Sequence, residues 1–165
     1  MTFHLWHIGH AARDTPSVIV WRLLAFDDLR VHELYEVLRL RSEVFVVEQQ
    51  CLFHDMDGTD PQAMHLLGVR DGELLAYARC FDAGAKFAEA SFGRVLTRQR
   101  VRRTGLGHTL IDQAVRAISQ LWGPQPIRIG AQMQLAGFYA QHGFEDAGKP
   151  YMEDGIEHLE MLRPA

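Results

Sequence analysis

One long amphipathic helix between two strand-like runs constrains the fold of this chain more than any other feature. The helix spans residues 104–122 (TGLGHTLIDQAVRAISQLW), and the runs on either side are 90–97 (ASFGRVLT) and 127–132 (IRIGAQ). Its apolar residues recur at three- and four-residue spacing on one broad face: Leu106, Leu110, Ile111, Ala114, Val115, Ile118 and Leu121. A helix that joins two strands of one sheet is a crossover, so these strands are expected to be parallel neighbours or near-neighbours.

Antiparallel strands are predicted upstream of this unit. Two extended runs, residues 64–70 and 73–81, are separated only by Asp71-Gly72, and such a two-residue connection is a strong hairpin signal. A short helix at 135–143 and a final strand at 156–162 complete the pattern. The order of elements predicts an α/β (α+β) fold with a mixed sheet.

The N-terminal part of this fold is expected to be a strand followed by a helix. The strand starts at Val18, and Asp27-Asp28 is the predicted N-cap of the helix. Residues of the helix that recur at helical spacing are Leu34, Val37, Leu38, Arg41, Val44 and Phe45. Asp-Gly and Asp-Pro steps mark residues 48–61 as a loop.

Composition and charge narrow the class of protein. The chain has 165 residues, 47% hydrophobic and 23% charged, as expected for one globular domain over residues 18–165 with an N-terminal extension, residues 1–17. The net charge of −4 argues against a nucleic-acid partner, which needs a basic face. No apolar run approaches the ~18 residues of a membrane span, and no signal peptide is evident. Cys51 and Cys80 are too few for a disulfide framework, which favours a cytoplasmic location.

The glycine-containing turn before the long helix is a candidate anion site. Residues 102–107 read Arg-Arg-Thr-Gly-Leu-Gly. The first N–H groups of a helix have no intrahelical partner and, with the helix dipole, suit a phosphate. Glycines at 105 and 107 allow close approach, and the arginines add positive charge. A dinucleotide-binding loop is not indicated because Leu110 stands where its third glycine belongs, and the P-loop motif is absent.

Two motifs in this region resemble those of the GNAT acyltransferases. Arg102-x-x-Gly105-x-Gly107 is similar to the family's R/Q-x-x-G-x-G/A motif, and residues 138–144 (FYAQHGF) are similar to its second signature. The segments LRLRSEVFVVEQ, DMDG, LLAYAR and YMEDGIEH resemble the ElaA-like branch, so the resemblance covers residues 18–163. It implies a mixed, mostly antiparallel twisted sheet flanked by helices, with splayed central strands.

The resemblance also implies acetyl-CoA as co-substrate, with its pyrophosphate on the loop N–H groups and its pantetheine along the preceding strand. Gln132 stands where the family has an Asn. The coenzyme-binding residues expected from the resemblance are Val95, Leu96, Thr97, Arg102, Arg103, Thr104, Gly105, Leu106, Gly107, His108, Gln132 and Phe138. The acceptor is expected to be the primary amine of a small molecule or peptide, attacking the acyl carbonyl directly.

Tyr139 occupies the family position that donates a proton to the departing thiolate, a role that suits a phenol with a pKa near 10; the alternative is that it only packs on its helix. The candidate bases are Glu43, Glu48, His65, Glu89 and His158. Glu48 ranks first because FVVEQ lies where the family places the acceptor, and a water relay without a dedicated base is the alternative.

Several other interpretations are weighed against this one. The acidic turn at residues 55–60 lacks the spacing of a calcium loop, and only Cys51-x-x-His54 is available for zinc, so no metal is expected. Cys80 is read as a small buried apolar residue rather than a nucleophile. Arg79 is expected either to form a buried ion pair or to contact an acceptor carboxylate. A non-catalytic acyl-CoA sensor or scaffold and a homodimer through the C-terminal strand stay open.

Overall fold

The computed structural model of the chain describes residues 18–165; the predicted extension at 1–17 lies outside the described residues. The helices are α1 (Val31–Arg41), continued by a π-helical segment, η2 (Ser42–Glu48), then α2 (Leu106–Trp122) and α3 (Ala136–Ala140). The strands are β1 (Val20–Ala25), β2 (Met64–Arg70), β3 (Glu73–Phe81), β4 (Ala90–Thr97), β5 (Ile127–Gln132), β6 (Glu145–Asp146), β7 (Tyr151–Glu153) and β8 (Ile156–Arg163).

These strands form one mixed, mostly antiparallel sheet, as predicted. Its order is β1-β2-β3-β4-β5-β8-β6, with β7 also paired to β8, and the β4–β5 pair is parallel while the others are antiparallel. Asp71 and Gly72 make the predicted hairpin turn with φ of 54° and 79°, the left-handed conformation that such a two-residue turn requires.

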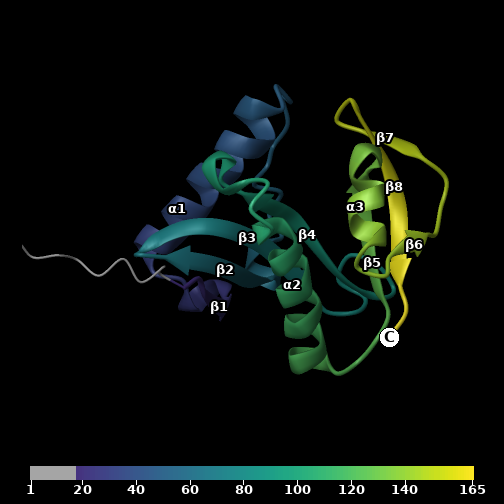
Figure 1. Ribbon diagram of the computed structural model, residues 1–165, viewed down its shortest axis with the longest axis horizontal. Coiled ribbons are helices and arrows are strands. Elements are labelled where there is room, and N and C mark those ends of the chain that lie inside the picture. Colours follow the sequence, from purple (N-terminus) through teal and green to yellow (C-terminus); the bar gives the residue numbers. More distant parts are fainter. Residues whose placement is uncertain (1–17) are drawn as a thin grey trace, which may run out of the picture.

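The two central strands separate soon after they meet. β4 and β5 pair only through Ala90 with Ile127 and Ser91 with Arg128, and beyond these pairs they diverge. The expected parallel crossover and the expected splayed central strands are both confirmed. Figure 1 shows the consequence, with β1–β4 and β5–β8 forming two arms of a V.

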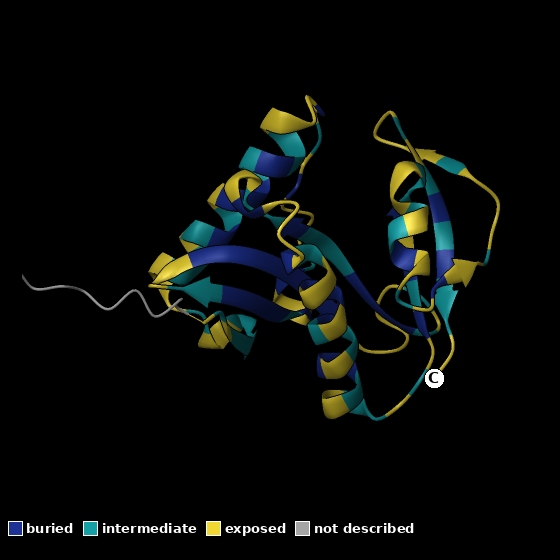
Figure 2. Cartoon of the chain, in the orientation of Figure 1, coloured by how far each residue is buried: buried dark blue, intermediate teal, exposed yellow. Residues whose placement is uncertain are grey.

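Helices cover both faces of the sheet, and each face has its own core. The larger core joins α2 and α3 to one face, and the smaller core joins α1 to the other through Tyr77 and Leu96. Figure 2 shows β3 buried along almost its whole length, while the outer helix faces and loop tips are exposed. Leu121, assigned from the sequence to the apolar face of α2, is 40% exposed, because the last turn of the helix extends beyond the sheet.

Two local predictions need correction. Asp27-Asp28 does not cap α1: it lies in a 3₁₀ turn, Phe26–Asp28, and α1 begins only at Val31. The N-terminus of α1 is instead capped by the Glu33 side chain, which accepts a hydrogen bond from the Arg30 N–H at 3.0 Å. The strands β6 and β7 were not foreseen. Within residues 18–165, the structure has no helix long and apolar enough to span a membrane.

Candidate acyl-CoA site and acceptor cleft

The loop between β4 and α2 presents free backbone donors at a helix N-terminus. The first helical hydrogen bond runs from the Thr109 N–H to the Gly105 carbonyl at 3.2 Å, so the N–H groups of Leu106, Gly107 and His108 precede the ladder. Gly105 is the N-cap with φ of 88°, and Arg103 also has a left-handed φ of 64°. The open space around Gly105 and the aligned N–H groups fit a phosphate.

Side chains around the loop fix its shape. Leu106 is buried in the core beneath the loop, and the Thr104 hydroxyl donates to the Val101 carbonyl at 2.7 Å. The Phe138 ring lies beside Gly107, where an added Cβ atom would be only 3.6 Å away, and its centroid is 4.7 Å from that of the His108 ring. The two sequence motifs, about thirty residues apart, therefore meet at the start of α2.

Arg102 and Glu48, assigned from the sequence to different roles, form an ion pair with each other. Arg102 Nη2 donates to Glu48 Oε2 at 2.6 Å, and Arg102 Nε contacts the carbonyl of Thr97 at 3.3 Å. Both side chains are partly exposed. This pair joins the end of η2 to the glycine loop before α2 (residues 102–108). Glu48 does not line the cleft described next.

A cleft of about 620 Å³ opens between the splayed strands. Its size is that of a small-molecule site. The apolar residues that line it include Val44 from η2, Phe92 and Val95 from β4, Ile129 from β5, and Leu135 and Tyr139 at α3. Beyond Ser91, β4 has no strand partner on its β5 side among the described residues, so its backbone polar groups are available to a ligand in the cleft.

One wall of the cleft is built on a buried ion cluster. Arg41 is fully buried and donates to Asp55 at 2.8 Å and to Asp60 at 2.6 Å. Arg79 makes two 2.8 Å hydrogen bonds to Asp57 and one of 3.0 Å to Asp60. The Arg79 guanidinium lowers the pKa of Asp57 far below its ordinary value, so this carboxylate stays ionised. Both of the roles considered for Arg79 are compatible with this place, since it forms buried ion pairs and also lines the cleft.

Two further cations extend from this cluster into the cleft. Arg94 Nε donates to Asp55 at 2.7 Å, and its guanidinium lies over the rings of Phe45 and Phe53, 5.7 and 5.4 Å from their centroids. Arg94 adopts a left-handed φ of 51° at a bulge in β4, which turns its side chain out of the regular alternation. Lys86 lies over the Phe81 ring, and its Nζ is 3.8 Å from Asp57, beyond hydrogen-bond distance.

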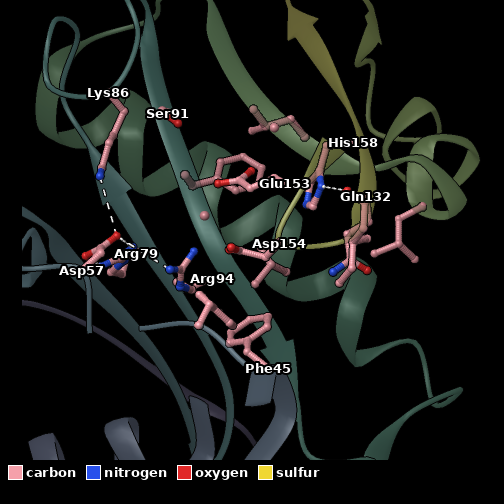
Figure 3. Close-up of a pocket in the computed structure, with 18 of the residues that line it drawn as sticks. Phe45, Asp57, Arg79, Lys86, Ser91, Arg94, Gln132, Glu153, Asp154 and His158 are labelled. Carbon is pink, nitrogen blue, oxygen red and sulfur yellow. Dashed lines mark hydrogen bonds and ion pairs between the residues drawn. The ribbon is translucent and has the colours of Figure 1, made fainter. Parts of the chain in front are cut away.

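The opposite wall is acidic and comes from β5, β7 and β8. Glu153, Asp154, His158 and Glu160 line it. Asp154 and Gly155 form a left-handed two-residue turn between β7 and β8, with φ of 50° and 80°. Figure 3 shows Glu153, Asp154 and His158 across the cleft from Lys86, Arg79 and Arg94.

Two contacts connect the walls above the cleft. Cys51 Sγ lies 3.1 Å from the carbonyl of Asp154, and Gln132 Nε2 lies 3.4 Å from Gln49 Oε1. The loop after η2 thus reaches both the β7–β8 turn and the end of β5. These contacts join the two arms of the V through the loop after η2.

Tyr139 lines the cleft and packs against the rings of Phe92 and Phe144, which also pack against each other. Burial raises its pKa to about 12. The sequence-based argument assumed a free phenol with a pKa near 10, so this part needs correction. The buried phenol stays protonated at neutral pH, and it is a weaker acid but still a hydrogen-bond donor.

Of the five candidate bases, only His158 lines the cleft. The others are engaged elsewhere: Glu43 lies 3.8 Å from Arg98, Glu89 pairs with Arg128, Glu48 pairs with Arg102, and His65 is buried. His158 Nδ1 is 2.9 Å from the Ile156 carbonyl. A carbonyl only accepts, so Nδ1 carries the hydrogen and the lone pair of the neutral ring is on Nε2.

Sequence reasoning missed the cations Lys86 and Arg94 and the acidic turn at Asp154-Gly155. The turn had a readable signal, because an Asp-Gly step between two extended runs predicts a hairpin here as it did at Asp71-Gly72. Lys86 and Arg94 had none, since their position depends on a bulge and on loops that pack from distant parts of the chain.

Comparison with known proteins defines the class. Residues 30–163 match the acetyltransferase (GNAT) domain family. The chain belongs to this family and is an acyl-CoA-dependent N-acyltransferase.

Its relatives include proteins of the ElaA type. The chain is 36% identical to protein ElaA of Escherichia coli over 148 residues, which cover 88% of this chain and 97% of that one. It is 41% identical to a UPF0039 protein of Synechocystis over 145 residues, covering 87% and 94% of the two chains. Among solved structures, an acyl-CoA N-acyltransferase from Pseudomonas aeruginosa matches with a TM-score of 0.83 and 39% identity, covering 88% of this chain and 99% of that one. The predicted ElaA-like membership is confirmed.

Proposed function

We propose that the chain transfers an acetyl group from acetyl-CoA to the primary amine of a small acceptor, by direct attack inside the cleft between β4 and β5. The observation that carries this proposal is the continuity of the two sites. Residues 98–105 connect the free N–H groups at the start of α2 to β4, the strand whose unpaired edge lines the cleft.

The pyrophosphate of the coenzyme binds the N–H groups between Arg103 and His108, with Arg102 beside it. Its pantetheine arm follows the backbone of Val95 to Thr97, replacing the strand partner that β4 lacks beyond Ser91. The side chain of Leu96 is buried in the core on the α1 side, so this strand supplies backbone contacts. Gln132 and Phe138 border the cleft and the loop, respectively.

The chemical step needs one proton acceptor and one donor. The acceptor nitrogen forms a bond to the acyl carbon while the carbon–sulfur bond breaks and the electron pair leaves on sulfur. Nε2 of His158 takes the proton that the amine loses, and we assign this role to His158 in place of Glu48 because His158 lines the cleft. The phenol of Tyr139 donates a hydrogen bond, and then a proton, to the departing thiolate.

The test measures the steady-state release of free thiol from acetyl-CoA in the presence of a panel of small primary amines. The products are identified by mass spectrometry. Acceptor-dependent release matched by an N-acetyl product is expected. The His158→Gln variant should lose about 10²-fold or more in turnover. Binding of acetyl-CoA without release for any amine would contradict the proposal and favour the alternative of a non-catalytic acyl-CoA-binding module.

A further inference from the structure

The charges that line the cleft are separated by sign. On the β3–β4 side, the lining cations are Arg79, Lys86 and Arg94, and the lining carboxylate is Asp57. The lining carboxylates on the β7–β8 side are Glu153, Asp154 and Glu160. A molecule in the cleft therefore meets positive charge on one side and negative charge on the other (Figure 3).

The ion cluster does not neutralise the basic wall. Three carboxylates, those of Asp55, Asp57 and Asp60, face four cations, those of Arg41, Arg79, Lys86 and Arg94. Nη1 of Arg94 donates to no described residue, and Lys86 Nζ has only the distant contact to Asp57. One positive charge and two sets of donors are left for a ligand.

The acidic wall has the complementary surplus. Glu160 accepts from Arg128 at 3.0 Å, but the carboxylates of Glu153 and Asp154 pair with no cation among the described residues. They flank His158, the group assigned to take the amine's proton. The two carboxylates attract an ammonium group to this wall, and Nε2 of a neutral His158 is the group placed to accept its proton.

The basic wall is not part of the coenzyme site. Along β3, Tyr77, Arg79 and Phe81 point to the face of the sheet covered by α1, whereas Ala78 and Cys80 pack with α2 on the other face. The phosphate loop belongs to α2. Lys86 lies over the ring of Phe81, and Arg94 lies over the ring of Phe45, which packs against the core on the α1 side. Both cations therefore lie on the opposite face from the loop that we assign to the pyrophosphate.

We propose that the acceptor is a small amino acid or a closely similar compound, with a carboxylate that binds Lys86 and Arg94 and a primary amine that binds between Glu153, Asp154 and His158. This inference rests on the proposed function and names the substrate class of the same cleft. A diamine or polyamine would place a second positive charge against the basic wall, which disfavours it. The Cys51–Asp154 contact across the cleft disfavours a protein substrate.

The experiment compares matched acceptors on the full chain. Thiol release from acetyl-CoA is measured with each of the twenty amino acids, and the best acceptor is then compared with its amide, its decarboxylated amine, its phosphonate analogue and a diamine. We expect the free carboxylate to exceed the amide and the amine at least tenfold in kcat/KM. Equal or better activity with the amide, the amine, the phosphonate or the diamine would overturn the assignment of a carboxylate.

Single substitutions test whether Lys86 binds the acceptor carboxylate. Lys86→Met should raise KM for the carboxylate acceptor about tenfold, and the preference for the free carboxylate over the amide in kcat/KM should fall by a similar factor. The fold should tolerate the change because Lys86 makes no hydrogen bond to a described residue. Lys149→Met is the matched control, since Lys149 is exposed and outside the cleft. An unchanged KM in Lys86→Met would overturn the proposal. If acetyl-CoA raises the melting temperature of the chain but no acceptor gives thiol release, the proposed function itself is contradicted.

Discussion

The glycine loop before α2 and the buried ion cluster differ in how the sequence forms them. The loop is continuous in sequence, and a few residues from Arg102 to His108 contain the glycines, the helix start and the donors. The cluster gathers Arg41 from α1, Asp55 and Asp60 from a loop, Arg79 from β3 and Arg94 from β4. The loop is exposed and open to a ligand, whereas the central arginine of the cluster is fully buried.

This difference implies that substitutions in the two regions have different effects. Residues 102–105 of the loop are exposed, so changes there should not disturb the fold, whereas Leu106 belongs to the core. The cluster holds the loop at residues 49–63 against β3 and β4, and so maintains one wall of the cleft. We therefore expect changes in the cluster to cost stability and changes in the loop to cost ligand binding.

The largest effect is expected for Arg41→Leu. Removing Arg41 leaves Asp55 and Asp60 buried with fewer partners, and loss of one member of a buried ion pair typically costs about 3–5 kcal/mol. The melting temperature should fall by roughly 10 °C or more for a chain of this length. Arg39→Leu, on the exposed side of the same helix, is the control and should melt like the parent. Equal melting of the two variants would contradict the structural role of the cluster.

Tyr139→Phe should lower kcat by about 10²-fold, because the departing thiolate loses its donor. Stability should change little, since the ring stays in its aromatic surroundings. Because burial raises the pKa of Tyr139 to about 12, the parent enzyme should lose no activity through this group below about pH 11. Unchanged turnover in the variant would remove Tyr139 from the mechanism.

A smaller effect is expected from pH at His65. Burial of the ring lowers the pKa of His65 below its ordinary value of 6.5, and the hydrogen bond to the Asp60 carbonyl only partly opposes this. Below pH 6.5 the unfolded chain therefore binds a proton at His65 more readily than the folded chain does. The contribution of His65 to the free energy of unfolding should be fully present above pH 6.5 and should decrease as the pH falls below it. Chemical denaturation between pH 8 and pH 5 measures this slope. The slope should be smaller in His65→Gln, and an equal slope in that variant would show that other groups cause it.

The smallest effect is expected for Glu48→Gln. The Glu48–Arg102 pair is partly exposed, and such pairs contribute about 0–1 kcal/mol. Turnover at saturating acetyl-CoA should stay close to that of the parent, because Glu48 does not line the cleft. A 10²-fold loss of kcat would restore Glu48 as the base and displace His158.

Periodicity and short motifs were sufficient to predict the sheet class, the crossover and the Asp71-Gly72 hairpin, because each depends on neighbouring residues. They also predicted the glycine loop, and comparison confirmed the family. The cluster could not be predicted in the same way. Arg41 was read as part of a helical apolar stripe and Asp55 as part of a loop, and only the fold brings them to 2.8 Å. The free Nε2 of His158 likewise depends on a local backbone contact.

The sequence left a homodimer through the C-terminal strand open, and it is still open. β8 pairs with β5 on one side and with β6 and β7 on the other, so both of its edges are used within the chain along much of its length. A dimer would have to use another surface or the short parts of β8 that these partners leave free.

The central claim is that the loop at the start of α2 holds the coenzyme, and a thermal melt of the chain with and without acetyl-CoA tests it most directly. At ~100 times the dissociation constant, linkage gives ~2.7 kcal/mol, a shift of roughly 5–10 °C. Gly107→Ala is the control, because its Cβ meets Phe138 at an ordinary 3.6 Å. Gly107→Glu should fold, since a carboxylate suits a helix N-terminus, and should lose the shift. A shift retained in Gly107→Glu, or absent in the parent, would contradict the account.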